Sequence, residues 1–168
     1  MPPSMHDLSV AVFSRMLGNL AGLLDKATAH AAEKKFDSAV LFNARLAPDM
    51  WSLSRQVQTA CDFAKGGSAR LAGMEVPKRD DNETTLEDLK ARIAWTRDFI
   101  GSIPREKLSD AAERPIVHEL RTMTIRLPGA AYLQGFSLPN FYFHVVTTYN
   151  ILRHNGVVLS KIDFVGPG

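Results

Sequence analysis

The chain has 168 residues, of which 45% are hydrophobic and 23% charged, and its 20 basic and 18 acidic residues leave a net charge of +2. This length and composition predict one globular domain over residues 1–168 rather than two independent ones. The basic residues are scattered and form no stripe that could follow a phosphate backbone, which argues against nucleic acid as a partner.

Four segments carry helical periodicity, with apolar residues three and four positions apart on one face. The first helix is expected to follow Ser4 and Asp7, which can accept hydrogen bonds from the N–H groups of its first turn. Its apolar face contains Phe13, Met16, Leu17, Leu20, Leu24 and Ala27. The second helix is expected to begin at about Pro48, a favoured first helical position, and to weaken at Gly66-Gly67. Its apolar face contains Leu53, Val57, Ala60 and Ala64.

The third helix is expected to begin at Thr84-Thr85, where Glu87 and Asp88 are placed to complete a capping box. Its apolar face contains Leu86, Leu89, Ile93 and Ile100. The fourth helix is expected to run from Pro139-Asn140 to Asn155-Gly156, a pair suited to a left-handed C-cap. Its apolar face contains Phe141, Val145, Thr148 and Leu152.

Between the third and fourth helices the spacing of apolar residues changes from 3.6 to 2. The sequence IVHELRTMTIRL alternates in part, and Pro128-Gly129 offers a turn before AAYLQGF, which together predict a two-stranded ribbon over about residues 113–136. A lone ribbon is marginal in water, so we expect it to lie against the helices or a partner subunit. The predicted fold is all-α, an antiparallel four-helix bundle with a small β-ribbon inserted before the last helix.

Cys61 is the only cysteine, which excludes an internal disulfide and a thiolate-rich metal cluster. The N-terminal sequence MPPSMHDLSVAVFSRML lacks the basic region and long apolar core of a signal peptide. No stretch reaches the roughly 18 uninterrupted apolar residues that span a bilayer. These features predict a cytoplasmic protein with no membrane partner.

Three stretches, RMLGNLAGLLDKA, LAPDMWSLSRQVQTACDFAKGGSARLAG and LPNFYFHVVTTYNILRHNGVVLSKIDF, together resemble a bacterial domain-of-unknown-function family. That family lies within the DinB/YfiT-like metalloenzyme superfamily. The resemblance covers nearly the whole chain. It implies a four-helix bundle that is often a homodimer.

The resemblance to the wider superfamily also implies three histidines around a divalent metal, one on the second helix and two spaced H-x-x-x-H on the fourth. His144 matches the first of that pair, but the residue four positions later is Thr148. The second helix has no histidine, and Asp49 and Gln56 are the nearest substitutes. We therefore expect no tightly bound metal, and the sequence indicates no cofactor.

His144 lies beside the apolar stripe of the fourth helix, and Gln56 and Asp49 occupy the corresponding shoulder of the second. If these shoulders face each other, Asp49, Gln56, His144 and Thr148 line one polar pocket. His144 is then either a hydrogen-bonded member of the core or part of a binding site. Three other groups are interpreted as structural or exposed: Trp51 and Trp95 as core anchors, Cys61 as a small buried hydrophobe, and His118 as a surface residue.

Three functions fit these features. The first is a small-molecule-binding domain with a degenerate metal site. The alternatives are a metal-dependent hydrolase or thiol-transferase-like enzyme, as elsewhere in the superfamily, and a non-catalytic stress-related interaction protein. We predict a homodimer with a two-fold interface. The reasons are the ribbon, the aromatic FYF segment and the resemblance to a family whose members are often homodimers.

Overall fold

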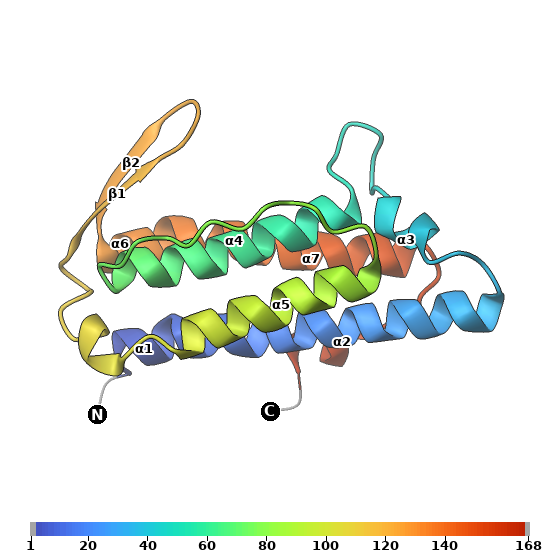
Figure 1. Ribbon diagram of the computed structural model, residues 1–168, viewed down its shortest axis with the longest axis horizontal. Helices are drawn as coiled ribbons and strands as arrows, with labels where there is room; N and C mark the ends of the chain where they lie inside the picture. The colour runs from blue at the N-terminus through green and yellow to red at the C-terminus, as the bar shows by residue number, and fades with distance from the viewer. Residues whose placement is uncertain (1–2, 167–168) are drawn as a thin grey trace.

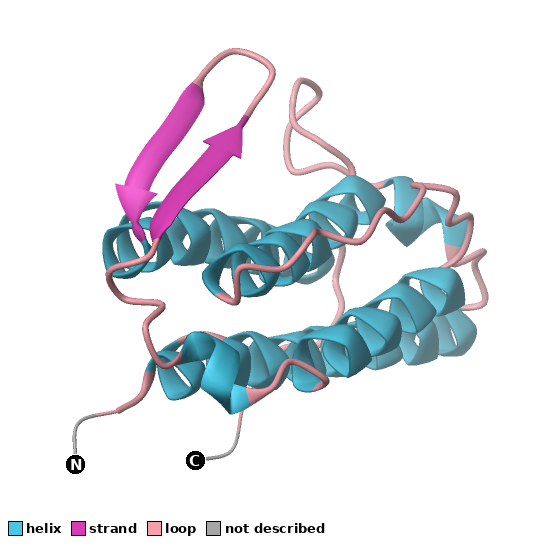
Figure 2. Cartoon of the chain, turned by 60° about the vertical axis from the view of Figure 1, so that its left-hand side comes forward, coloured by secondary structure: helices cyan, strands magenta, loops and turns pink. Residues whose placement is uncertain are grey.

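The computed structural model describes residues 3–166, and within them four long helices lie side by side in two layers (Figure 1). They are α2 (Val10–Lys34), α4 (Leu53–Leu71), α5 (Leu86–Gly101) and α7 (Leu138–His154). α4 and α7 form one layer, and α2 and α5 form the other (Figure 2). The shorter helical elements are α1 (Met5–Leu8), α3 (Ala39–Asn43), η1 (Arg105–Leu108), α6 (Gly129–Tyr132), η2 (Leu133–Ser137) and α8 (Lys161–Val165). The prediction of a mainly helical chain with a small antiparallel ribbon is confirmed.

The long helices do not all alternate in direction. α4 and α7 are antiparallel, as are α2 and α5 (Figure 1). α4 and α5 run the same way, since Arg92 pairs with Asp62 and Trp95 lies beside Lys65, three residues further along each helix. The prediction of an antiparallel arrangement is therefore wrong for this pair. The cause is the segment 72–85, which crosses the length of the molecule before α5 begins.

The core is built from the predicted apolar stripes. On α2, Phe13, Leu17, Leu20 and Leu24 are 0% exposed, and Phe13 packs edge-on against Phe141 of α7. By length and composition alone, the helical segment Met5–Lys34 is apolar enough to cross a membrane. The core helix of a globular protein passes the same test, and the buried stripe gives α2 that role here.

The predicted caps of α5 and α7 are present. Thr85 accepts a hydrogen bond from the backbone N–H of Asp88, and the Asp88 side chain completes the capping box. α7 ends at Asn155, followed by Gly156 with a φ of +88°. Such caps satisfy the backbone groups that a helix leaves free at its ends.

The start of α4 differs from the prediction. It begins at Leu53, with Ser52 as its N-cap, and Pro48 instead lies in a turn closed by a hydrogen bond from Met50 N–H to Ala47 O. Proline is as favourable at the second position of such a turn as at the start of a helix. α4 then continues through Gly66-Gly67 to Leu71, since both glycines are buried against neighbouring segments.

The ribbon is shorter than predicted. β1 (Pro115–Glu119) and β2 (Thr124–Pro128) pair in antiparallel register, with Val117 opposite Arg126. The predicted second strand, AAYLQGF, is wrong, because this segment forms α6 and the π-helical turn η2. Gly129 begins that helical segment where any side chain would collide with the backbone of Ala111. The hairpin is anchored by the buried side chain of Ile116 and projects beyond the helices (Figure 2).

Candidate functional site

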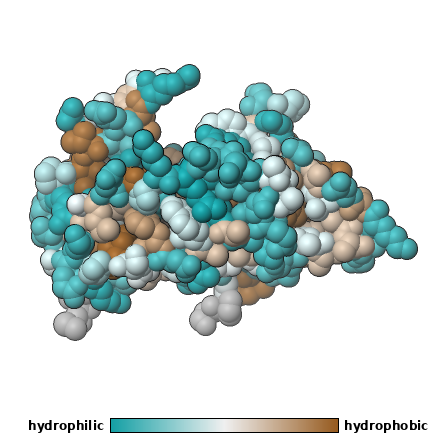
Figure 3. Space-filling view, in the orientation of Figure 1, coloured by the Kyte–Doolittle hydropathy of each residue, from teal (hydrophilic) through white to brown (hydrophobic). Residues whose placement is uncertain are grey.

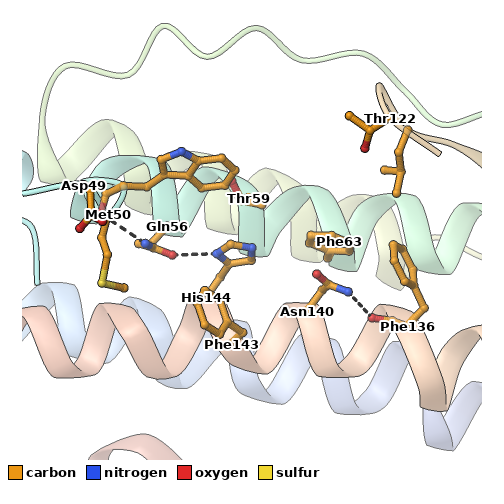
Figure 4. Close-up of a pocket in the computed structure, with 12 residues that line it drawn as sticks. Asp49, Met50, Gln56, Thr59, Phe63, Thr122, Phe136, Asn140, Phe143 and His144 are labelled. Carbon is orange, nitrogen blue, oxygen red and sulfur yellow. Dashed lines mark hydrogen bonds between the residues drawn. The ribbon is translucent and has the colours of Figure 1, made fainter. Parts of the chain in front are cut away.

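His144 of α7 meets Gln56 of α4, with Nδ1 of the imidazole 2.7 Å from Oε1 of the amide (Figure 4). The amide nitrogen of Gln56 donates to the backbone carbonyl of Trp51 at 3.3 Å. That contact directs the nitrogen toward Trp51 and the oxygen toward His144, so the imidazole donates from Nδ1. A neutral imidazole with its proton on Nδ1 keeps Nε2 as a hydrogen-bond acceptor.

The surroundings of His144 keep the ring neutral. Its ring lies nearly parallel to those of Trp51 and Phe63, each with its centroid 5.8 Å away. Burial and, to a smaller extent, the positive charge of Arg55 together lower the pKa of His144 to about 4. Nε2 has no partner within residues 3–166, yet it is not sealed from solvent. At neutral pH it is therefore an unused acceptor that faces open space.

That space is a cleft of about 680 Å³ between the two helices and the hairpin. Its helical walls are formed by Gln56, Thr59 and Phe63 of α4 and by Asn140, Phe143 and His144 of α7. Asp49, Met50 and Trp51 close one end, and Phe136, Leu120 and Thr122 form the other. In Figure 3 the outline of the molecule is hollowed between the hairpin and the 44–52 loop. The walls are mainly aromatic, with a few polar atoms directed inward, as in many small-molecule sites.

The π-helical turn η2 shapes one end of this cleft. It places Phe136 against Phe63, with ring centroids 5.9 Å apart. The wider turn is supported by Asn140, whose Nδ2 donates to the Phe136 carbonyl at 2.8 Å, and by Ser137, which approaches α4 closely at Gly67. π-helical turns inside α-helices occur frequently at functional sites. The sequence analysis missed this feature and Phe136 with it.

The other two predicted site residues lie differently. Asp49 lines the same cleft, but it is an exposed residue of the turn before α4, not a member of the helical shoulder. The shoulder prediction for Asp49 is wrong because α4 begins four residues after it. Thr148 is fully buried, and its hydroxyl donates to the His144 carbonyl at 2.9 Å. It is not among the residues that line the cleft.

The donor set does not fit the divalent metal of the superfamily. His144 offers one free nitrogen, Thr148 offers a hydroxyl already engaged with the backbone, and Gln56 offers an amide oxygen already bound to the imidazole. Within residues 3–166, no group of three histidine, cysteine, aspartate or glutamate side chains is arranged so that it could hold a metal ion. A stable site on helices needs about three such ligands.

Three interpretations of single residues need a comment. Trp51 is 48% exposed and forms a wall of the cleft, so its interpretation as a core anchor is wrong. His118 is only half-exposed, and its Nδ1 lies 3.0 Å from the hydroxyl of the buried Tyr132. Cys61 is buried as predicted, and burial raises the pKa of its thiol to about 12.

A second polar cluster, centred on Arg92 of α5, was not predicted. Arg92 is 1% exposed and pairs with Glu83 at 3.1 Å, with Asp62 at 3.0 Å and with Asp81 at 2.9 Å. Gln58 of α4 also donates to Glu83. This cluster ties the crossover segment 72–85 to α4 and α5. Its signal in the sequence is an arginine inside the stripe of Leu89, Ile93 and Ile100.

The fold and this site define a DinB-like helical protein. The sequence model of the domain of unknown function DUF1993 matches residues 5–165, and the chain belongs to that family. It is also similar to the crystal structure of a DinB family member protein from Shewanella denitrificans, at 44% identity and a TM-score of 0.91. The alignment covers 98% of this chain and 93% of that one. No curated protein matches the sequence.

Proposed function

We propose that this protein binds a small organic molecule in the cleft beside His144, on a four-helix-bundle scaffold, without a resident metal. The observation that carries the proposal is the unused Nε2 acceptor of His144. Gln56 orients the ring through Nδ1, and His144 lines an aromatic cleft. Buried polar atoms are normally satisfied within the protein. An oriented acceptor left without a partner beside a cavity is therefore suited to a donor on a ligand.

Binding is favoured over acid–base catalysis by the electrostatics of the site. A general base works best when its pKa lies near the pH at which it acts. Burial lowers the pKa of His144 to about 4, which makes it a weak base but a constant hydrogen-bond acceptor. The metal-dependent enzyme of the superfamily is disfavoured by the donor set.

The test uses Trp51 as a reporter, because it stacks on His144 in the wall of the cleft. The chain has two tryptophans, so a Trp95→Phe background leaves Trp51 as the sole indole. Neutral and charged metabolites are screened by fluorescence and by thermal shift. We expect at least one compound to change the emission of Trp51 and to raise the melting temperature.

A matched pair of variants locates the binding. His144→Leu should weaken each hit at least about tenfold, the usual loss when a hydrogen bond at a ligand is removed. His154→Leu changes an exposed histidine of the same helix and should leave binding intact. Hits that bind both variants equally, or a complete absence of hits, would contradict the proposal and favour a non-catalytic interaction protein.

We also propose that the protein is a cytoplasmic homodimer. Support for the dimer comes from apolar side chains exposed beside the cleft and on the hairpin: Trp51, Phe143, Val146, Val117 and Met123. Support for the cytoplasm comes from the lone, buried cysteine, since disulfides are common in oxidising compartments. Light scattering at micromolar concentration should give twice the chain mass of 18.6 kDa; a monomer mass would contradict the dimer.

A further inference from the structure

A second cleft, of about 480 Å³, adjoins the one beside His144. The two share Phe63 of α4 and Leu120 of the hairpin as common walls. The second lies between α4, the crossover segment 76–81 and β1. Phe63 and Leu120 therefore lie at the boundary between the two clefts.

The second cleft differs from the first in charge. Its lining includes four basic side chains, Lys65, Arg70, Lys78 and Arg79, and three acidic ones, Asp62, Asp80 and Asp81. Asp62 and Asp81 are both engaged by Arg92, at 3.0 and 2.9 Å. Arg70 and Lys78 have no carboxylate partner within residues 3–166. Two of the three acidic groups are thus paired within the fold, and Asp80 has no ion-pair partner among residues 3–166. The four basic and three acidic side chains leave the cleft an excess of one positive charge.

The guanidinium of Arg70 lies over Gly66, where the lack of a side chain leaves room for it. A Cβ at that position would lie 2.6 Å from Nη1 of Arg70, so the guanidinium lies close against the backbone of α4. A glycine inside a helix lowers the stability of that helix. At position 66 it leaves room for the side chain of Arg70. The planar donors of a guanidinium suit a carboxylate or another oxyanion.

His118 extends the same surface. Its ring lines the second cleft, and the charge of Arg70 adds to burial in lowering the pKa of His118, which falls to about 4. In the tautomer in which the Tyr132 hydroxyl donates to Nδ1, His118 presents an N–H donor from Nε2. The polarity is opposite to that of His144, which presents an acceptor.

We propose that the joined clefts bind a small organic anion with a flat apolar body, whose body rests on Phe63 beside His144 and whose oxyanion meets Arg70 and Lys78. This inference rests on the proposed function, because it names the class of ligand for the same site. It adds the charge of that ligand and the residues that recognise it.

Two fluorescent probes with one shared body test the inference. Anilinonaphthalene sulfonate carries an anionic group, and phenylnaphthylamine has the same aromatic amine without it. Both offer an N–H to His144. We expect the wild-type protein to bind the sulfonate about tenfold more tightly, as one charge-assisted contact would provide, and to lose much of that preference in high salt.

Variants then separate the charge from the body. Arg70→Gln should bring the affinity for the sulfonate down to that for the neutral probe and leave the neutral probe unchanged. Lys78→Gln, at an exposed position that the fold does not need, should reduce the preference in the same direction. Arg97→Gln, on α5 facing Ser14 of α2, is the matched control and should change neither affinity.

The outcomes distinguish this inference from the proposed function. Equal affinities for the two probes, or a preference that Arg70→Gln and Lys78→Gln leave unchanged, would overturn the anion site alone, provided that His144→Leu still weakens the neutral probe. If neither probe binds, or if His144→Leu affects neither, the proposed function fails as well.

Discussion

Two buried polar clusters lie on opposite sides of α4, and they differ in the number of charged partners that the central side chain has. The Arg92 cluster brings one guanidinium together with three carboxylates and the backbone carbonyl of Asp80. Among the residues that the structure describes, the His144 cluster contains a single hydrogen bond between side chains, and Nε2 of the imidazole has no protein partner. One cluster closes a gap in the fold, and the other borders a cleft.

The difference shows how a buried polar group can be assigned to structure or to function. A charge inside a protein is tolerated only when it is paired, so the many partners of Arg92 indicate a structural role. A neutral ring that keeps an oriented acceptor toward open space serves no such role. The comparison predicts that changes at Arg92 act mainly on stability, and that changes at His144 act on binding with a smaller effect on stability.

The largest effect on stability is expected for Arg92→Met. Removing one partner of a buried ion pair typically costs about 3–5 kcal/mol, because the remaining charge stays buried and uncompensated. Here Glu83, whose side chain is 2% exposed, would lose its main partner. Urea denaturation should show this loss in the free energy of unfolding. Arg97→Met, on the exposed face of the same helix, should change it by no more than about 0.5 kcal/mol.

A second change at the cluster makes the comparison sharper. In the double variant Arg92→Met, Glu83→Gln the carboxylate is neutral, so part of the lost stability should return. If Arg92→Met unfolds no more easily than Arg97→Met, the cluster is not structural and the distinction between the two sides of α4 fails.

Lowering the pH should destabilise the protein through its buried histidines. The pKa of His144 falls from 6.5 to about 4 because of burial and then of Arg55. Between these values the unfolded chain binds a proton that the folded chain does not, so stability is lost as the pH falls from 6.5 toward 4. The slope is at most about 1.4 kcal/mol per pH unit for this group.

Melting temperatures between pH 7 and pH 5 measure this effect, above the range in which the lowered pKa values of Asp7 and Asp88 matter. His144→Leu should flatten the dependence, and the remainder should come from His118, whose pKa is lowered in the same direction. His154→Gln, at an exposed position, should keep the wild-type slope. An unchanged slope in His144→Leu would mean that His144 is not held neutral by the fold.

Much of the fold follows from local sequence patterns. The stripes of α2 and α7 and the Thr85 cap depend on residues within a few turns of each other. The facing of His144 toward Gln56, which is 88 residues away in the sequence, was predicted from the face that each residue occupies on its own helix. The segment AAYLQGF was misassigned because a short apolar run fits a strand and a buried helix equally well. Pro48 was misassigned because proline is favourable at the start of a helix and inside a turn.

Only site residues that lie on regular helices were correctly placed from the sequence. Gln56 and His144 lie on regular helices, so their faces can be calculated from spacing. Phe136 depends on a π-helical turn, and Leu120 depends on how the hairpin leans over α4. Neither is encoded in the spacing of residues along one element, because both arise from contacts between distant segments.

A smaller change in stability is expected from the His144–Gln56 pair. His144→Leu alone leaves the amide oxygen of Gln56 without its donor, at a cost of about 1–2 kcal/mol. Adding Gln56→Leu removes the unsatisfied partner, so the double variant should regain most of this loss. Chemical denaturation of the two single variants and the double variant measures the coupling. If the losses of unfolding free energy in the two single variants add up in the double variant, the two side chains are not energetically coupled.

The smallest effect is expected from metal. A chelator, or added zinc or nickel, should shift the melting temperature by nothing measurable, and protein purified without a metal-affinity tag should contain far less than one metal per chain. The physical reason is the donor set: one imidazole nitrogen, an exposed carboxylate at Asp49 and an amide oxygen already bound to the imidazole fall short of three ligands that converge. Near-stoichiometric metal that disappears in His144→Ala would reverse the argument, because the cleft beside His144 would then be a metal centre and not a site for an organic ligand alone.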